Sequence, residues 1–152
     1  MFTSDTKRRI SAVLSADVVG YSRMMGDDEQ YTVEVLNRYR NVFATAISEH
    51  SGRLVDTAGD SILAVFESVV EAVTCAITIQ KVLNEQNELL DETRRMRFRI
   101  GINLGDIIEQ EDGTVYGDGV NIAARLESLA EPGGIAVSRL VFEFVEGKVD
   151  AE

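Results

Sequence analysis

Cysteine and histidine are nearly absent from this chain. Its 152 residues include one histidine, His50, and one cysteine, Cys75. A single cysteine cannot form an internal disulfide, so the sequence carries no sign of an oxidising compartment, and the apolar helical stretch around Cys75 predicts a buried small side chain. A lone histidine has no second member with which to build a histidine zinc site or a serine–histidine catalytic triad.

Long apolar runs and an excess of positive charge are also lacking. No window approaches the ~20 apolar residues of a transmembrane helix, and residues 1–10, MFTSDTKRRI, lack the apolar core of a signal peptide. The net charge of −11 disfavours broad binding to nucleic acid or to an anionic membrane surface. We therefore expect a cytoplasmic protein with no nucleic-acid partner and no direct membrane insertion.

The arginines gather just before one predicted strand. Arg94, Arg95, Arg97 and Arg99 form this basic cluster. Because the chain as a whole is acidic, the cluster predicts a solvated strand entrance rather than a patch that binds nucleic acid.

What is present is the composition of an ordinary globular protein, with 45% hydrophobic and 27% charged residues. It suits a single domain over residues 1–152, with about residues 1–9 frayed. Apolar runs predict strands at 10–19, 54–55, 62–66, 98–108, 114–116 and 135–138, and three- and four-residue spacing predicts helices at 27–50, 68–92, 120–130 and 139–145. Hairpins mixed with long covering helices predict an α+β fold, with the sheet covered mainly on one face.

The stretch 54–66, LVDTAGDSILAVF, is the centre of the functional argument. Gly59 followed by Asp60 between two apolar runs predicts a tight hairpin, because glycine supplies the positive φ of the turn. The tip carries two carboxylates, Asp56 and Asp60, which is more negative charge than a turn requires.

Asp17 is the second carboxylate in an unusual place, between Ala16 and Val18 of an apolar strand. Such a side chain is costly unless it is paired, caps a helix or binds metal. Asp17 and Asp60 both lie at strand ends beside glycine, and two carboxylates meeting there suit a divalent cation. Two such cations could activate an attacking oxygen and stabilise a leaving phosphate. The alternative is that Asp17 caps a local turn and Asp60 is a turn residue only.

Two further groups suit a phosphate ligand. Asn121 and Arg125 share one face of the helix predicted at 120–130, and Arg125 has no acid three or four residues away. A tertiary salt bridge and a fork of hydrogen bonds to phosphate are the two roles open to it. Gly20, Tyr21 and Ser22 follow the first strand, where backbone amides at the start of a helix make an anion site.

Taken together, these residues resemble the catalytic domain of the class III nucleotidyl cyclases. The resemblance runs from about residue 11 to residue 145 and is carried by SADVVGYS (15–22), GRLVDTAGDSILAVF (52–66), RIGINLGDII (99–108) and TVYGDGVNIAARLESLAEPGGIAVS (114–138). It implies a ferredoxin-like catalytic fold with a mixed sheet. It also implies a homodimer with its active sites at the interface, in intracellular signal transduction, with regulatory domains in a longer chain among its partners.

The resemblance assigns a role to each group. It implies that Asp17 and Asp60, with the carbonyl of Val18, bind two Mg²⁺ or Mn²⁺ ions per active site, and that residues 20–22 hold the triphosphate. Asn121 and Arg125 come from the partner chain, where Asn121 orients the ribose and Arg125 stabilises charge on the α-phosphate. Attack by the 3′-hydroxyl then yields a 3′,5′-cyclic nucleotide and pyrophosphate, by positioning and charge neutralisation.

Two positions depart from the family pattern. Adenylate cyclases usually have a lysine where this chain has Asp56, and the other base-reading position is Thr114, whose hydroxyl can accept from the adenine amino group. Thr114 favours ATP, whereas the acid at 56 favours GTP and a guanylate cyclase. The family also continues past residue 145 into strands with a lysine that touches the triphosphate, and Lys148 does not match its setting. This departure supports a third interpretation, a catalytically silent, dimerising regulatory module.

Overall fold

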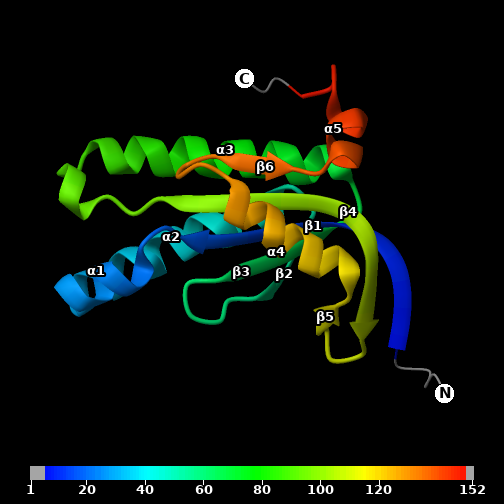
Figure 1. Ribbon diagram of the computed structural model, residues 1–152, viewed down its shortest axis with the longest axis horizontal. Coiled ribbons are helices and arrows are strands. Elements are labelled where there is room, and N and C mark those ends of the chain that lie inside the picture. The colour runs from blue at the N-terminus through cyan, green and yellow to red at the C-terminus, as the bar shows by residue number, and fades with distance from the viewer. Residues whose placement is uncertain (1–5, 150–152) are drawn as a thin grey trace.

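The computed structural model describes residues 6–149 (Figure 1). Its elements are β1 (Thr6–Val18), α1 (Tyr21–Asp27), α2 (Glu29–Glu49), β2 (Arg53–Asp56), β3 (Ile62–Phe66), α3 (Val69–Glu88), the 3₁₀ turn η1 (Glu92–Arg94), β4 (Phe98–Gln110), β5 (Val115–Tyr116), α4 (Asp118–Leu129), β6 (Ile135–Val137) and α5 (Arg139–Val145). Among these residues, no helix combines the length and the apolar character needed to cross a membrane.

The sheet confirms the predicted α+β class with a mixed sheet. Its strands follow the order β2-β3-β1-β4-β5 with antiparallel neighbours, and β6 pairs in parallel with β4. The long helices α2 and α3 pack on one face, and α4 covers the opposite face, in front of the sheet in Figure 1. Helix α4 therefore approaches a different set of side chains from those of the main core.

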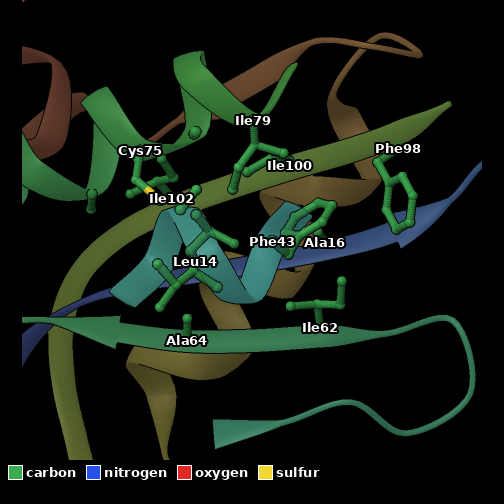
Figure 2. Packing of buried hydrophobic residues seen from close by; sticks show 14 of the residues in the cluster. Leu14, Ala16, Phe43, Ile62, Ala64, Cys75, Ile79, Phe98, Ile100 and Ile102 are labelled. Carbon is green, nitrogen blue, oxygen red and sulfur yellow. The ribbon is translucent and has the colours of Figure 1, made fainter. Parts of the chain in front are cut away.

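The two faces of β1 and β4 differ because successive side chains of a strand alternate. The even-numbered side chains from Ala12 to Val18 and from Phe98 to Ile102 enter the main core beneath α2 and α3, where the rings of Phe43 and Phe98 lie 4.8 Å apart between centroids (Figure 2). The odd-numbered side chains face α4. In the antiparallel register, Ser15 lies opposite Gly101 and Asp17 lies opposite Arg99. Ser15 and Arg99 accordingly contact residues of α4.

The N-terminal part of the chain differs from the prediction in two respects. Residues 6–9 are predicted to be frayed, but they pair with β4 as far as Gln110, and Arg8 adds an ion pair to Asp106 at 2.6 Å. Residues 1–5 lie outside the described residues. The helix predicted at 27–50 is preceded by the separate helix α1, and Asp28 caps α2 by accepting a hydrogen bond from the amide of Tyr31 at 3.1 Å. A cap at this position ends one helix and starts the next.

Glycine at position 101 sets the distance between α4 and the sheet. A Cβ atom at Gly101 would lie 2.3 Å from the amide nitrogen of Glu127 and 2.4 Å from the carbonyl oxygen of Ala123. Both are backbone atoms and cannot rotate away. We expect Gly101→Ala to lower the free energy of unfolding by about 3 kcal/mol, because α4 must move outward. Urea unfolding of the variant measures this change.

Gly26→Ala in α1 is the matched control. A Cβ atom there meets nothing within 4 Å, and the substitution is expected to raise stability by about 0.5 kcal/mol through the lower entropy of the unfolded chain. Equal effects of the two substitutions would contradict the close approach of α4 to β4.

Candidate active site

Asp17 faces an arginine directly across the strand pair. Nε and Nη2 of Arg99 donate to Oδ1 of Asp17 at 3.2 and 3.1 Å, and Nη2 also donates to Oδ2 at 3.0 Å. Both side chains are about one quarter exposed, at 27% and 23%. The hydrogen bond to Asp17 is the main cause that raises the pKa of Arg99. Asp17 accepts from Arg99 and not from a local backbone amide, so the prediction that it caps a local turn is wrong.

Glu127 is a buried acid beneath the same site. It points from α4 toward the sheet and accepts a hydrogen bond from Oγ of Ser15 at 2.9 Å. Burial raises the pKa of Glu127 to about 7, a hydrogen bond with Asp17 acts in the same direction, and the hydrogen bond from Ser15 opposes both. Burial and the neighbouring Asp17 thus favour the protonated form of the Glu127 carboxyl group.

Asp60 reaches the end of β1 from the β2–β3 hairpin. Its Oδ2 accepts a hydrogen bond from the amide of Val18 at 3.1 Å, and the fields of both Asp17 and Asp60 act on Arg99. The hairpin is confirmed, but the tight turn is wrong. Strand β2 ends at Asp56 and β3 begins at Ile62, so residues 57–61 form a loop that is longer than a tight turn. Gly59 lies in this loop with a positive φ of 58°.

Arg40 of α2 holds this loop in place. Its Nη2 donates to the carbonyl oxygen of Thr57 at 3.3 Å and to that of Gly59. Nε of Arg40 is buried and has no hydrogen-bond partner in the described part of the chain. The loop that carries Asp60 is thus tied to a core helix as well as to β1.

The donor set at the end of β1 fits a hard divalent cation. Two carboxylates reach this strand end, Asp17 from β1 and Asp60 from the 57–61 loop, where Asp60 accepts from the amide of Val18. Within residues 6–149, no group of three or more His, Cys, Asp or Glu side chains is placed to hold a metal ion. Magnesium takes one or two carboxylates and fills its remaining positions with water and phosphate oxygens, so these residues suffice.

Asn121 and Arg125 lie on the outer face of α4 and are exposed, whereas Ala123 and Glu127 of the same helix face the sheet. Across residues 6–149, the side chain of Arg125 makes no ion pair or hydrogen bond, and nothing of either kind joins Asn121 or Arg125 to the two aspartates. Among the described residues, the tertiary salt bridge considered for Arg125 does not form. The structure therefore brings Asp17 and Asp60 together and leaves Asn121 and Arg125 directed away from the sheet.

A hollow of about 430 Å³ contains both predicted base-reading residues, Asp56 of β2 and Thr114 before β5. The amide of Thr114 donates to Oδ1 of Asp112 at 2.9 Å. Hydrogen bonding by Thr114, through its backbone first, lowers the pKa of Asp112. A larger hollow between α3, β6 and α5 contains none of the predicted site residues.

Gly20 connects β1 to α1 in a left-handed conformation with φ 70°. An L side chain rarely adopts this conformation, which accounts for glycine at the position. Tyr21 and Ser22 open the first turn of α1, where backbone amides have no partner within the helix. Their contact with a triphosphate stays a prediction.

Arg99 and Glu127 are the site residues that the sequence reasoning missed. The arginine cluster was predicted to be a solvated strand entrance, which suits Arg95 and Arg97, since both pair with the exposed Glu92. The prediction is wrong for Arg99, which pairs with Asp17. The available signal was Asp17 itself, because a carboxylate in an apolar strand requires a cation or several donors nearby.

Comparisons with known proteins agree with this geometry. Residues 4–151 match the family described as the adenylate and guanylate cyclase catalytic domain. A putative adenylate cyclase 3 from Rhizobium meliloti is 43% identical over 153 residues, which cover 100% of this chain and 26% of the relative. The chain thus spans about a quarter of that relative's length.

Two solved structures share the fold. A crystal structure of an adenylate/guanylate cyclase/hydrolase from Silicibacter pomeroyi superposes with a TM-score of 0.89 and 40% identity, covering 97% of this chain and 86% of that chain. The adenylyl cyclase CyaB from P. aeruginosa gives a TM-score of 0.83 and 25% identity, with 95% and 84% coverage.

Proposed function

Because the chain belongs to the adenylate and guanylate cyclase catalytic-domain family, we propose that it converts ATP into 3′,5′-cyclic AMP and pyrophosphate in intracellular signal transduction. The observation that carries the proposal is the hydrogen bond of 3.1 Å from the Val18 amide to Asp60, across 42 positions of sequence. This hydrogen bond holds Asp60 at the end of β1, next to Asp17.

In this proposal Asp17, Asp60 and the Val18 carbonyl hold two Mg²⁺ or Mn²⁺ ions. When bound, the ions would neutralise charge at the phosphates and would lower the pKa of the attacking hydroxyl. The chain itself positions the substrate, because the amides of Tyr21 and Ser22 face the triphosphate and the tied 57–61 loop keeps Asp60 close to β1. A mechanism that relies on metal ions and on substrate positioning requires no protein nucleophile. This agrees with the scarcity of cysteine and histidine in the chain.

The active site is completed by a second copy of the chain. Asn121 of the partner subunit orients the ribose, and Arg125 of the partner subunit stabilises charge on the α-phosphate. Two features of the single chain support this arrangement. Both side chains are exposed on α4, and Arg125 has no partner within residues 6–149. An exposed guanidinium group without a partner in its own chain suits a phosphate that is bound in the site of another subunit.

The base-reading hollow supports ATP as the substrate. Thr114 lines the hollow, and its hydroxyl oxygen can accept a hydrogen bond from a donor there. The exocyclic amino group of adenine is such a donor, whereas guanine presents a carbonyl at that position.

Asp56 is the observation that favours GTP as the second candidate. It lines the same hollow and is exposed, and its carboxylate can accept from the N–H groups on the guanine edge. A competition assay with equal ATP and GTP and excess Mn²⁺ decides between them. We expect cyclic AMP to exceed cyclic GMP by at least about tenfold, which corresponds to one hydrogen bond of discrimination.

Thr114→Val tests the cause of this preference. Valine keeps the shape and removes the acceptor, so kcat/KM for ATP is expected to fall by about tenfold while that for GTP changes little. Cyclic GMP as the only product of the wild type would overturn the ATP assignment. Absence of both products from a demonstrated dimer of the full-length protein would favour the catalytically silent module.

A further inference from the structure

We propose that Arg53 is a positioning residue of the base-reading hollow, the hollow of about 430 Å³ that contains Asp56 and Thr114. Arg53 holds the turn that carries Thr114 against the strand that carries Asp56, and it thereby sets the preference for one purine base. The inference rests on the proposed function, since it takes this hollow as the site of the base. It gives Arg53 no contact with the reacting atoms.

The two walls of the hollow come from opposite edges of the sheet. Strand β2, which ends at Asp56, lies at one end of the order β2-β3-β1-β4-β5, and β5, which directly follows Thr114, lies at the other. Three strands separate them, so among residues 6–149 no β-ladder fixes the distance between Asp56 and Thr114. That distance must be set by side chains that reach across the sheet.

A small apolar cluster on the α4 face brings the two edges near each other. Val55, Leu63 and Val115 belong to this cluster and also line the hollow. Apolar contacts are not directional, so they draw β2 and the β4–β5 hairpin together without fixing the orientation of the polar groups beside them. A directional contact is needed to fix that orientation.

Arg53 of β2 makes this directional contact. Its Nη1 donates to the carbonyl oxygen of Gly113 at 3.2 Å, and its Nη2 donates to Oε2 of Glu109 at 2.5 Å. Both acceptors belong to the β4–β5 hairpin. Across residues 6–149, no other hydrogen bond or ion pair joins β2 to this hairpin.

The bond to Gly113 fixes the peptide group that leads into Thr114. Arg53 holds the carbonyl end of this group, and Oδ1 of Asp112 accepts from its amide end at 2.9 Å. Gly113 has a φ of 93°, which an L side chain rarely adopts, and a Cβ atom there would lie 3.4 Å from Nη1 of Arg53. Because a peptide group is planar, holding both of its ends sets the direction from which Thr114 enters the hollow.

Glu109 is shared by two arginines. Its Oε1 accepts from Nε of Arg9 at 3.0 Å, while its Oε2 accepts from Arg53. The Glu109 side chain is 22% exposed, so these ion pairs are better shielded from water than an ordinary surface pair. Because Arg9 keeps Glu109 paired, removal of Arg53 leaves no partly buried carboxylate without a cation.

Arg53→Met tests the inference, because methionine keeps an apolar stem and removes the donors. Base preference is measured without turnover, since 3′-deoxy-ATP and 3′-deoxy-GTP lack the attacking hydroxyl. Calorimetric titration of the full-length protein with each nucleotide and Mn²⁺ gives the ratio of their dissociation constants. We expect about a tenfold preference for 3′-deoxy-ATP in the wild type and a preference of less than about threefold in Arg53→Met.

Steady-state kinetics give a second measurement on the same variant. KM for ATP is expected to rise by about fivefold in Arg53→Met, while kcat changes by less than about twofold. The reason is that Arg53 contacts neither Asp17 nor Asp60, so its loss weakens binding of the base and leaves the metal-site acids in place.

Arg9→Met is the matched control. It is the same substitution, and it removes the other arginine from Glu109 while the bond from Arg53 to Gly113 stays in place. Its base preference should equal that of the wild type. Both variants should lose less than about 3 °C in melting temperature, because each loses one partly exposed ion pair and keeps the other.

The outcomes separate this inference from the proposed function. A preference that Arg53→Met retains, or that Arg9→Met loses equally, would overturn the inference, and so would a wild type with equal affinity for the two nucleotides. A wild-type preference for 3′-deoxy-GTP that Arg53→Met loses would support the inference and overturn the ATP assignment.

A wild type that binds one nucleotide preferentially but forms neither cyclic product would refute the proposed cyclase activity. The ratio of dissociation constants in Arg53→Met would still decide the inference in that case. Absence of binding of either nucleotide to the wild type would overturn both.

Discussion

Replacement of Asp60 by asparagine is expected to reduce the cyclase turnover number by at least about a thousandfold. Asparagine keeps an oxygen that can accept from the Val18 amide, so the 57–61 loop stays in place. It loses the negative charge that the cation needs, and metal-assisted charge stabilisation is worth several kcal/mol, at about 1.4 kcal/mol per tenfold in rate. Cyclic nucleotide production at saturating Mn²⁺, together with the dimer fraction and the melting temperature, measures the effect.

Asp91→Asn is the control for this experiment. Asp91 is an exposed acid before η1 whose side chain makes no capping hydrogen bond, and its amide form should retain full activity. Asp17→Asn should lose as much activity as Asp60→Asn, because each carboxylate holds one side of the same cation pair. Substantial turnover by either metal-site variant would refute the metal assignment.

A mixture of two inactive variants is expected to recover about a quarter of wild-type activity. One variant carries Asp60→Asn and the other carries Arg125→Ala. In a homodimer with shared sites, random exchange makes half of the dimers mixed, and each mixed dimer has one site with neither lesion, which gives about one quarter of all sites intact. Co-expression with two affinity tags isolates the mixed dimer, and its specific activity should be about half that of the wild type.

The matched control mixes Asp60→Asn with Asp17→Asn. Both lesions then fall on the metal-binding side, so every site of the mixed dimer contains one of them and activity should stay at the background of the single variants. An isolated mixed dimer of Asp60→Asn and Arg125→Ala with no recovered activity would show that Arg125 does not act across the interface.

The secondary structure could be predicted where the signal is local. The long helices and the strands of the central sheet follow from apolar periodicity, and the hairpin follows from two apolar runs around a glycine. The failures occur where non-local contacts decide. Residues 6–9 extend β1 because β4 lies alongside as far as Gln110, and the 57–61 loop is longer than a tight turn because Arg40 and Val18 hold it open.

In the candidate site, too, local sequence patterns predicted some residues, and non-local contacts decided the others. Asp17 and Asp60 could be selected as candidates from the sequence, because a carboxylate beside apolar strand residues is unusual, and the family resemblance gave them their predicted metal role. Arg99 could not be distinguished from Arg95 and Arg97, because all three share one basic cluster and only strand register gives each its partner. Glu127 lies two positions from Arg125 on α4, and only the packing of the helix shows which of the two is buried.

The sequence by itself determined the fold class and the family, and it predicted the two acids of the candidate site, because each depends on short-range patterns of residue type. The tertiary structure alone decided that Asp17 is held by Arg99, that Glu127 lies beneath it, and that Thr114 is oriented by Asp112 beside Asp56. These pairings depend on the register of β1 against β4 and on how closely α4 approaches Gly101. Register and approach are set by contacts between segments far apart in sequence, which no local pattern records.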